Sequence, residues 1–85
     1  MMPASQLPVR PYFDRKENAR RILTFIRAYD AETGLSPTII EIAAGCYMSR
    51  SNVVRYLDWL EAWGFLTRIP HVPRSIVLLK TNRRL

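Results

Sequence analysis

The chain has 85 residues, and its 13 Lys and Arg against 7 Asp and Glu give a net charge of +6. A chain of this length forms one small domain of modest stability, which dimerisation would increase. No apolar run approaches the ~20 residues that cross a membrane, and the start lacks the basic-then-apolar pattern of a secretory signal. Cys46 is the only cysteine, which excludes an internal disulfide and a cysteine metal cluster. We therefore expect a cytoplasmic protein without a membrane partner.

The positive charge is concentrated in the second half of the chain. Residues 49–85 carry seven cationic side chains and two acidic ones, a net +5, whereas residues 1–48 carry six against five, a net +1. Such a concentration is typical of a protein that binds nucleic acid. The plainer alternative is a basic surface that serves only solubility.

Residues 1–13 contain Pro3, Pro8 and Pro11 and show no helical or strand periodicity. Because proline restricts the residue before it to extended conformations, we expect a flexible N-terminal arm. Such an arm can place an arginine, here Arg10, in a minor groove. An unstructured tail is the simpler interpretation.

The first regular element is an amphipathic helix, expected from residue 15 to about residue 32. Asp14 and Glu17 have the spacing of a capping box, and Gly34 suits the residue that ends a helix. One face of this segment is apolar at helical spacing, through Ile22, Leu23, Ile26 and Tyr29.

The segment from residue 38 to residue 64 is organised as two further helices. Thr38 and Glu41 form a second capping box, and the Ser49 hydroxyl is placed to cap the next helix. Gly64 suits the left-handed position at its end. Two helices joined by about four residues form a helix-turn-helix, and the inward side of the second consists of Val53, Leu57 and Leu60.

With those three residues pointing inward, the first half of this helix presents polar side chains to solvent. A recognition helix places its N-terminal residues against base edges in the major groove. Arginine can grip guanine, and asparagine adenine, through two hydrogen bonds each. An ordinary solvated helix face is the alternative. The predicted major-groove residues are Ser49, Arg50, Ser51, Asn52 and Arg55.

A β-hairpin is expected to follow the second of these helices. Residues 65–69 and 75–79 are β-prone, and Pro70 and Pro73 lie in the turn between them. A basic tail, residues 80–85, completes the chain. The residues predicted to contact DNA from the wing or along its backbone are Thr38, Arg68, Arg74 and Ser75.

The helix-turn-helix resembles the winged helix-turn-helix transcription regulators. The run SRSNVVR at residues 49–55 resembles the recognition helix of GntR-type repressors. The runs GLSPTIIEIA at 34–43 and PRSIVL at 73–78 resemble the DNA-binding domain of LexA-type repressors. Tyr47 stands where many family members have a turn glycine. The resemblance covers residues 14–79 and implies a mainly α, three-helix winged helix-turn-helix with a small β-hairpin. It implies a small regulator that binds double-stranded DNA sequence-specifically. Because one such module has a small footprint on DNA, we expect a homodimer on a two-fold site.

A second function class remains open from the sequence. Tyr56, Trp59 and Trp63 form an aromatic flank that either widens the core or docks a protein partner, because exposed aromatics are enriched at interfaces. The chain would then be a winged helix that serves as a protein-interaction module, or a small inhibitor that occupies a partner's nucleic-acid site. It would bind a protein partner rather than DNA. Exposure of the two tryptophans would favour this second class.

The sequence gives no support for catalysis, and we expect a non-enzyme. A lone histidine, His71, does not complete a metal site, and no glycine-rich phosphate loop is present. LexA-type repressors carry a C-terminal self-cleaving protease domain, and this chain ends where such a domain would begin. We therefore expect no cofactor, no metal and no small-molecule ligand.

Overall fold

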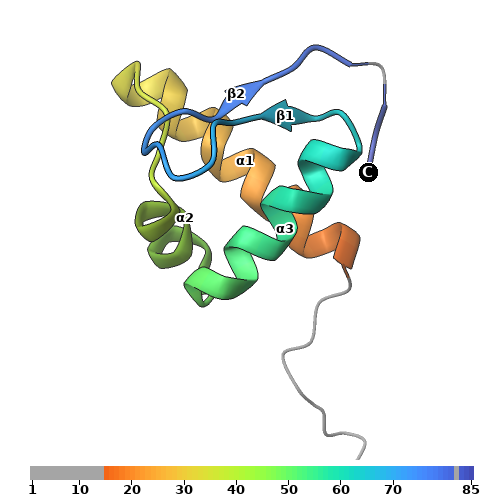
Figure 1. The fold of residues 1–85 in the computed structure, drawn as a ribbon, viewed down its shortest axis with the longest axis horizontal. Helices are drawn as coiled ribbons and strands as arrows, with labels where there is room; N and C mark the ends of the chain where they lie inside the picture. The colour runs from red at the N-terminus through yellow and green to blue at the C-terminus, as the bar shows by residue number, and fades with distance from the viewer. Residues whose placement is uncertain (1–14, 82) are drawn as a thin grey trace, which may run out of the picture.

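The computed structural model describes residues 15–81 and 83–85, so the predicted arm at 1–13 and the capping residue Asp14 lie outside the described residues. Within them the chain forms three helices followed by a small antiparallel hairpin (Figure 1). The predicted fold class is confirmed. The elements are α1 (Arg15–Thr33), α2 (Ile39–Cys46), α3 (Arg50–Ala62), β1 (Leu66–Thr67) and β2 (Val77–Leu78).

The three helices pack around one apolar core, which the hairpin closes on one side. On α3 the predicted inward residues Val53, Leu57 and Leu60 are all fully buried. Each large aliphatic side chain buried in this way stabilises the fold by about 1.5–3 kcal/mol. The polar side of α3 is therefore turned to solvent. The core residues from α1 and α2 are Ala19, Ile22, Leu23, Ile26, Ile42, Ala43 and Cys46.

The predicted caps of the helix-turn-helix are present. The Thr38 hydroxyl accepts a hydrogen bond from the Glu41 amide, and the Glu41 carboxylate accepts one from the Thr38 amide. The Ser49 hydroxyl accepts a hydrogen bond from the Asn52 amide at 3.2 Å and begins α3. Gly64 has a φ of 86°, the left-handed conformation predicted for the end of this helix. Local sequence therefore defines both helices of the motif.

The hairpin is shorter than predicted, because only two residues of each expected five-residue strand pair. Leu66 lies opposite Leu78 and Thr67 opposite Val77. Beyond this ladder the Ser75 hydroxyl accepts a hydrogen bond from the Ile69 amide, at 3.0 Å. A side chain thus takes the donor that a longer strand would use for pairing, and nearby prolines supply none.

The described end of the chain lies against the helices. The Arg83 guanidinium donates to the Trp63 carbonyl at 3.0 Å, and Arg20 donates to the Leu85 carbonyl at 3.0 Å. The Leu85 side chain packs against the core. The part of the basic tail that the structure describes therefore contacts α1 and the end of α3. In the described part of the chain, none of the helices has the length and apolar character needed to span a bilayer.

Candidate nucleic-acid interface

The first half of α3 presents a cationic and polar face. The five predicted major-groove residues are all exposed. Within residues 15–81 and 83–85, neither Arg50 nor Arg55 has an ion-pair or hydrogen-bond partner. The first turn of α3 also contains no acidic residue. The positive end of the helix dipole adds to the charge of the two guanidiniums. This face, defined as Ser49, Arg50, Ser51, Asn52 and Arg55, is called the α3 face below.

The spacing on the α3 face allows several side chains to meet one ligand. Ser51 and Arg55 are four residues apart and therefore lie on the same side of the helix. Asn52 follows Ser51, and the Ser49 and Ser51 hydroxyl oxygens are 3.3 Å apart. The face thus brings together the Arg55 guanidinium, the Asn52 side-chain amide and two serine hydroxyls. These are the groups that recognise guanine, adenine and phosphate in DNA.

Arg68, predicted as a wing contact, is paired with acids of α3. Its Nη2 donates to Asp58 Oδ1 at 2.6 Å, and its Nη1 lies 3.5 Å from Glu61 Oε1, where the hydrogen-bond geometry is poor. Only 14% of the Arg68 side chain is exposed. The guanidinium therefore links the residue that follows β1 to α3. Its predicted contact with DNA stays a prediction.

Arg74 is paired in a similar way with the start of α2. Its two terminal nitrogens lie 3.1 and 3.0 Å from the two carboxylate oxygens of Glu41, and Nη1 also donates to the Ser36 carbonyl at 3.0 Å. The Thr38 amide and then Arg74 donate hydrogen bonds that lower the pKa of Glu41 from 4.5 to about 2. Glu41 in turn raises the pKa of Arg74. The DNA contact predicted for Arg74 likewise stays a prediction.

The two hydroxyls predicted to contact DNA from the wing or along its backbone, those of Thr38 and Ser75, have partners inside the domain. Thr38 caps α2 through the hydrogen bond to Glu41. The Ser75 hydroxyl lies 2.9 Å from the Val72 carbonyl and accepts from the Ile69 amide. Both residues are half-buried. These contacts shape the loop and the helix start, and their contacts with DNA stay predictions.

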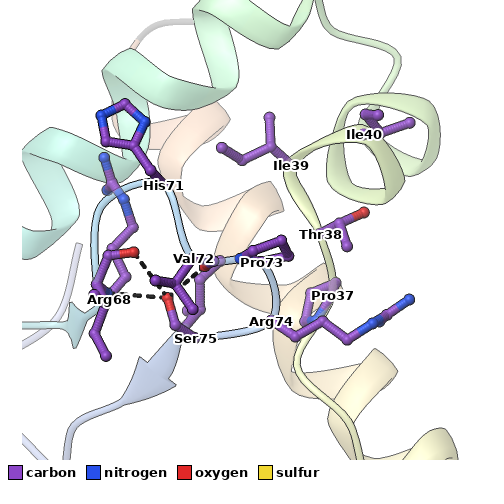
Figure 2. Close-up of a pocket in the computed structure, with 12 residues that line it drawn as sticks. Pro37, Thr38, Ile39, Ile40, Arg68, His71, Val72, Pro73, Arg74 and Ser75 are labelled. Atoms are coloured by element: carbon purple, nitrogen blue, oxygen red, sulfur yellow. Dashed lines mark hydrogen bonds between the residues drawn. The ribbon is translucent and has the colours of Figure 1, made fainter.

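A hollow of about 340 Å³ lies between the start of α2 and the β1–β2 connection (Figure 2). Its walls are mainly apolar, and Ile40, Ile69 and Val72 on them are exposed. Sequence reasoning did not single out this hollow. The available signal was the pair Ile39 and Ile40, because adjacent residues of a helix point about 100° apart. Ile39 packs against the core, whereas Ile40 is exposed.

The aromatic flank of α3 is largely used within the domain. Trp59 and Trp63 are both half-buried, with ring centroids 5.5 Å apart in a stacked arrangement. The Arg15 guanidinium lies 4.2 Å from the Trp59 ring centroid, a cation–π distance. Trp63 packs against the core. The exposure that would favour a protein-docking flank is therefore not observed for either tryptophan.

Two further reactive side chains in the chain are Cys46 and His71. Among residues 15–81 and 83–85, no three His, Cys, Asp or Glu side chains are grouped to hold a metal ion. Cys46 is buried, and burial raises the pKa of its thiol. His71 is exposed in the β1–β2 connection.

A helix-turn-helix with an exposed cationic recognition helix and a following hairpin defines the winged helix-turn-helix class of DNA-binding domains. A family model of the LexA DNA binding domain matches residues 16–75. The chain belongs to this family.

Two curated relatives agree with the family match. A LexA repressor of Carboxydothermus hydrogenoformans is 41% identical over 61 residues, which is 71% of this chain and 30% of the relative. A LexA repressor of Thermosipho melanesiensis is 34% identical over 64 residues, 75% of this chain and 32% of the relative. The chain thus spans about a third of the length of these relatives. The family model that it matches is that of the DNA-binding domain.

Proposed function

We propose that this chain binds double-stranded DNA sequence-specifically and acts as a small transcriptional repressor in the cytoplasm. The α3 face enters the major groove. Arg50, Asn52 and Arg55 read base edges there, while the Ser49 and Ser51 hydroxyls and the first amides of α3 hold a phosphate. Bound at a promoter, the domain would exclude other proteins from the same stretch of DNA.

The observation that carries this proposal is that, within the part of the chain that the structure describes, the two arginines of the α3 face have no ion-pair partner. A guanidinium with an acidic partner has part of its charge neutralised and some of its five N–H donors occupied, so it offers less to DNA. Arg50 and Arg55 have no such partner among the described residues, and the first turn of α3 has no acid. Both are therefore available to DNA without any rearrangement of the domain.

Two copies are proposed to bind one site. A single module of this kind buries only about 600–1,000 Å² on DNA, which limits its affinity. Two copies on a two-fold site, with half-sites about 34–36 Å apart, would combine their contacts. Lengthening the spacer of a two-half-site duplex by half a helical turn should then remove the gain over a single half-site.

The test is fluorescence anisotropy of a labelled mixed-sequence duplex, titrated at two salt concentrations. We expect non-specific dissociation constants of about 10⁻⁴–10⁻⁶ M that weaken steeply as salt rises. Lys16→Ala is the charge-matched control for Arg50→Ala, because Lys16 lies near Trp63 and Phe65 at the opposite end of α3. Absence of binding at low salt would refute the proposal and favour a protein-interaction module.

A further inference from the structure

Tyr47 occupies the turn between α2 and α3 in an unusual way. Its φ of 57° and ψ of 48° are left-handed, a conformation that non-glycine residues seldom adopt. Tyr47 is 90% exposed, the highest value among the large apolar or aromatic residues that the structure describes as exposed. An aromatic ring at this position therefore gains little from packing.

The backbone of the turn fixes where this side chain points. The Tyr47 amide and the Met48 amide both donate to the Ala43 carbonyl, the latter at 3.0 Å. Met48 packs against the core, and Ser49 then caps α3. With its main chain held on both sides, Tyr47 projects its ring outward, two residues before the N-cap of the proposed recognition helix.

The surroundings of Tyr47 favour an anionic ligand. Ser49, Arg50 and Ser51 follow it and are exposed. The N-terminus of α3 adds the positive end of a helix dipole. A phenol hydroxyl is a hydrogen-bond donor on a rigid ring, and it extends further from the backbone than a serine hydroxyl does. Tyrosine is among the side chains that donate to DNA phosphates.

We propose that Tyr47 is a further DNA-contacting residue, whose hydroxyl donates a hydrogen bond to a backbone phosphate at the edge of the groove that α3 enters. The contact rests on the proposed function of the α3 face. It gives the turn a positioning role on the backbone, separate from the base reading by Arg50, Asn52 and Arg55. The exposed, left-handed Tyr47 then serves DNA binding and lowers the stability of the fold.

The experiment compares Tyr47→Phe and Tyr47→Gly with the wild-type chain, by anisotropy on the same duplexes and by thermal unfolding. Tyr47→Phe removes one oxygen and keeps the ring and the backbone conformation. We expect it to bind about 3–10-fold more weakly, equally on every duplex sequence, because phosphates carry no sequence information. Its melting temperature should stay that of the wild type.

Tyr47→Gly removes the hydroxyl, the ring and the conformational strain together. We expect the same or a larger loss of affinity, with a melting temperature higher by roughly 2–5 °C. His71→Gly is the matched control for strain, because His71 has a φ of 64° and is also exposed. It should raise the melting temperature without the loss of affinity seen for Tyr47→Gly.

The outcomes separate this inference from the function on which it rests. Wild-type affinity in Tyr47→Phe overturns the phosphate contact while leaving DNA binding by the chain intact. A loss confined to duplexes that differ at one base pair overturns it too, because the residue would then read a base. If the wild-type chain binds no duplex at low salt, the proposed function itself fails.

Discussion

The arginines of the α3 face and those of the wing region have different surroundings. Arg50 and Arg55 are exposed and lack acidic partners within the described residues. Arg68 is paired with two acids of α3, and Arg74 with Glu41 at the start of α2. The same side chain type offers charge to solvent in one region. In the other it joins elements of the domain to each other.

This difference shows that a count of charges overstates the electrostatic footprint of the wing. Of the seven cationic side chains in residues 49–85, Arg68 and Arg74 have acids within ion-pair distance. An arginine with a bidentate carboxylate partner contributes little net field to a nearby phosphate. We therefore expect affinity and specificity to depend mainly on the α3 face, and stability to depend on the wing arginines.

The largest expected effect is on DNA binding by Arg55→Ala. A bidentate arginine contact with guanine discriminates by about 1–3 kcal/mol, so affinity for the preferred site should fall roughly 5–150-fold. Selectivity should relax at one base pair. Because Arg55 has no intramolecular partner among the described residues, the melting temperature of the variant should hardly differ from that of the wild type. Anisotropy on duplexes substituted at single positions, with thermal unfolding alongside, measures both quantities.

Arg50→Ala supplies the companion measurement on the same face. We expect a loss of similar size at a different base pair, because the two residues are five positions apart on α3. Lys16→Ala, on α1 near the far end of α3, should leave selectivity unchanged. Equal weakening on all duplexes by both arginine variants would contradict base reading, and would leave the α3 face a phosphate contact only.

Arg68→Ala should have a smaller effect, and it should be on stability. The change removes a 2.6 Å hydrogen bond to Asp58 and leaves both acids of α3 without their partner. Since Asp58 is largely exposed, solvent screening reduces the loss to about 1 kcal/mol. The melting temperature should fall by roughly 4–8 °C, as thermal unfolding followed by circular dichroism would show.

DNA-binding measurements on Arg68→Ala show whether Arg68 stabilises the fold, as the other wing arginine is expected to, or contacts DNA, as the α3 face is expected to. Below its melting temperature, Arg68→Ala should keep the base preference of the wild type. An unchanged melting temperature with a clearly weaker salt dependence of binding would contradict its structural role. It would instead support the phosphate contact that the sequence pattern predicts for this residue.

The helices and their caps could be predicted because their signals are local. The Thr38 and Glu41 capping box, the Ser49 cap and the left-handed Gly64 all depend on residues within a few positions. The extent of the strands was predicted wrongly. β-propensity does not reveal that the Ser75 side chain would take the Ile69 amide and end the ladder early.

The partners of the wing arginines could not be predicted from the sequence, because they are distant along the chain. Arg68 and Asp58 are ten positions apart, and Arg74 and Glu41 are 33 apart. Sequence composition shows that a charge is present, but tertiary folding determines which opposite charge neutralises it. The α3 face was easier to predict, since helical periodicity alone separates its outward residues from Val53, Leu57 and Leu60.

The smallest expected effect concerns Glu41→Gln and its dependence on pH. The pKa of Glu41 is about 2 in the folded chain, against an ordinary 4.5. A lowered pKa means that the ionised carboxylate stabilises the folded chain above pH 4.5, and that this contribution disappears as the pH falls through 2. Thermal unfolding should therefore show the variant melting roughly 5 °C lower at pH 7 and close to the wild type at pH 2.

Glu41→Gln also tests, through DNA binding, whether the pairing with Glu41 keeps Arg74 from contacting DNA. Glutamine still accepts a hydrogen bond from the Thr38 amide, but it no longer neutralises Arg74. If that pairing is what keeps Arg74 from DNA, Glu41→Gln should steepen the dependence of log K on log salt by up to about 0.9, the value of one phosphate contact. Arg74→Ala, in the wild-type background, should change this slope by less. A full loss of about 0.9 in Arg74→Ala would instead show that the arginine contacts phosphate despite its carboxylate partner, and the two cationic regions would then act together on DNA.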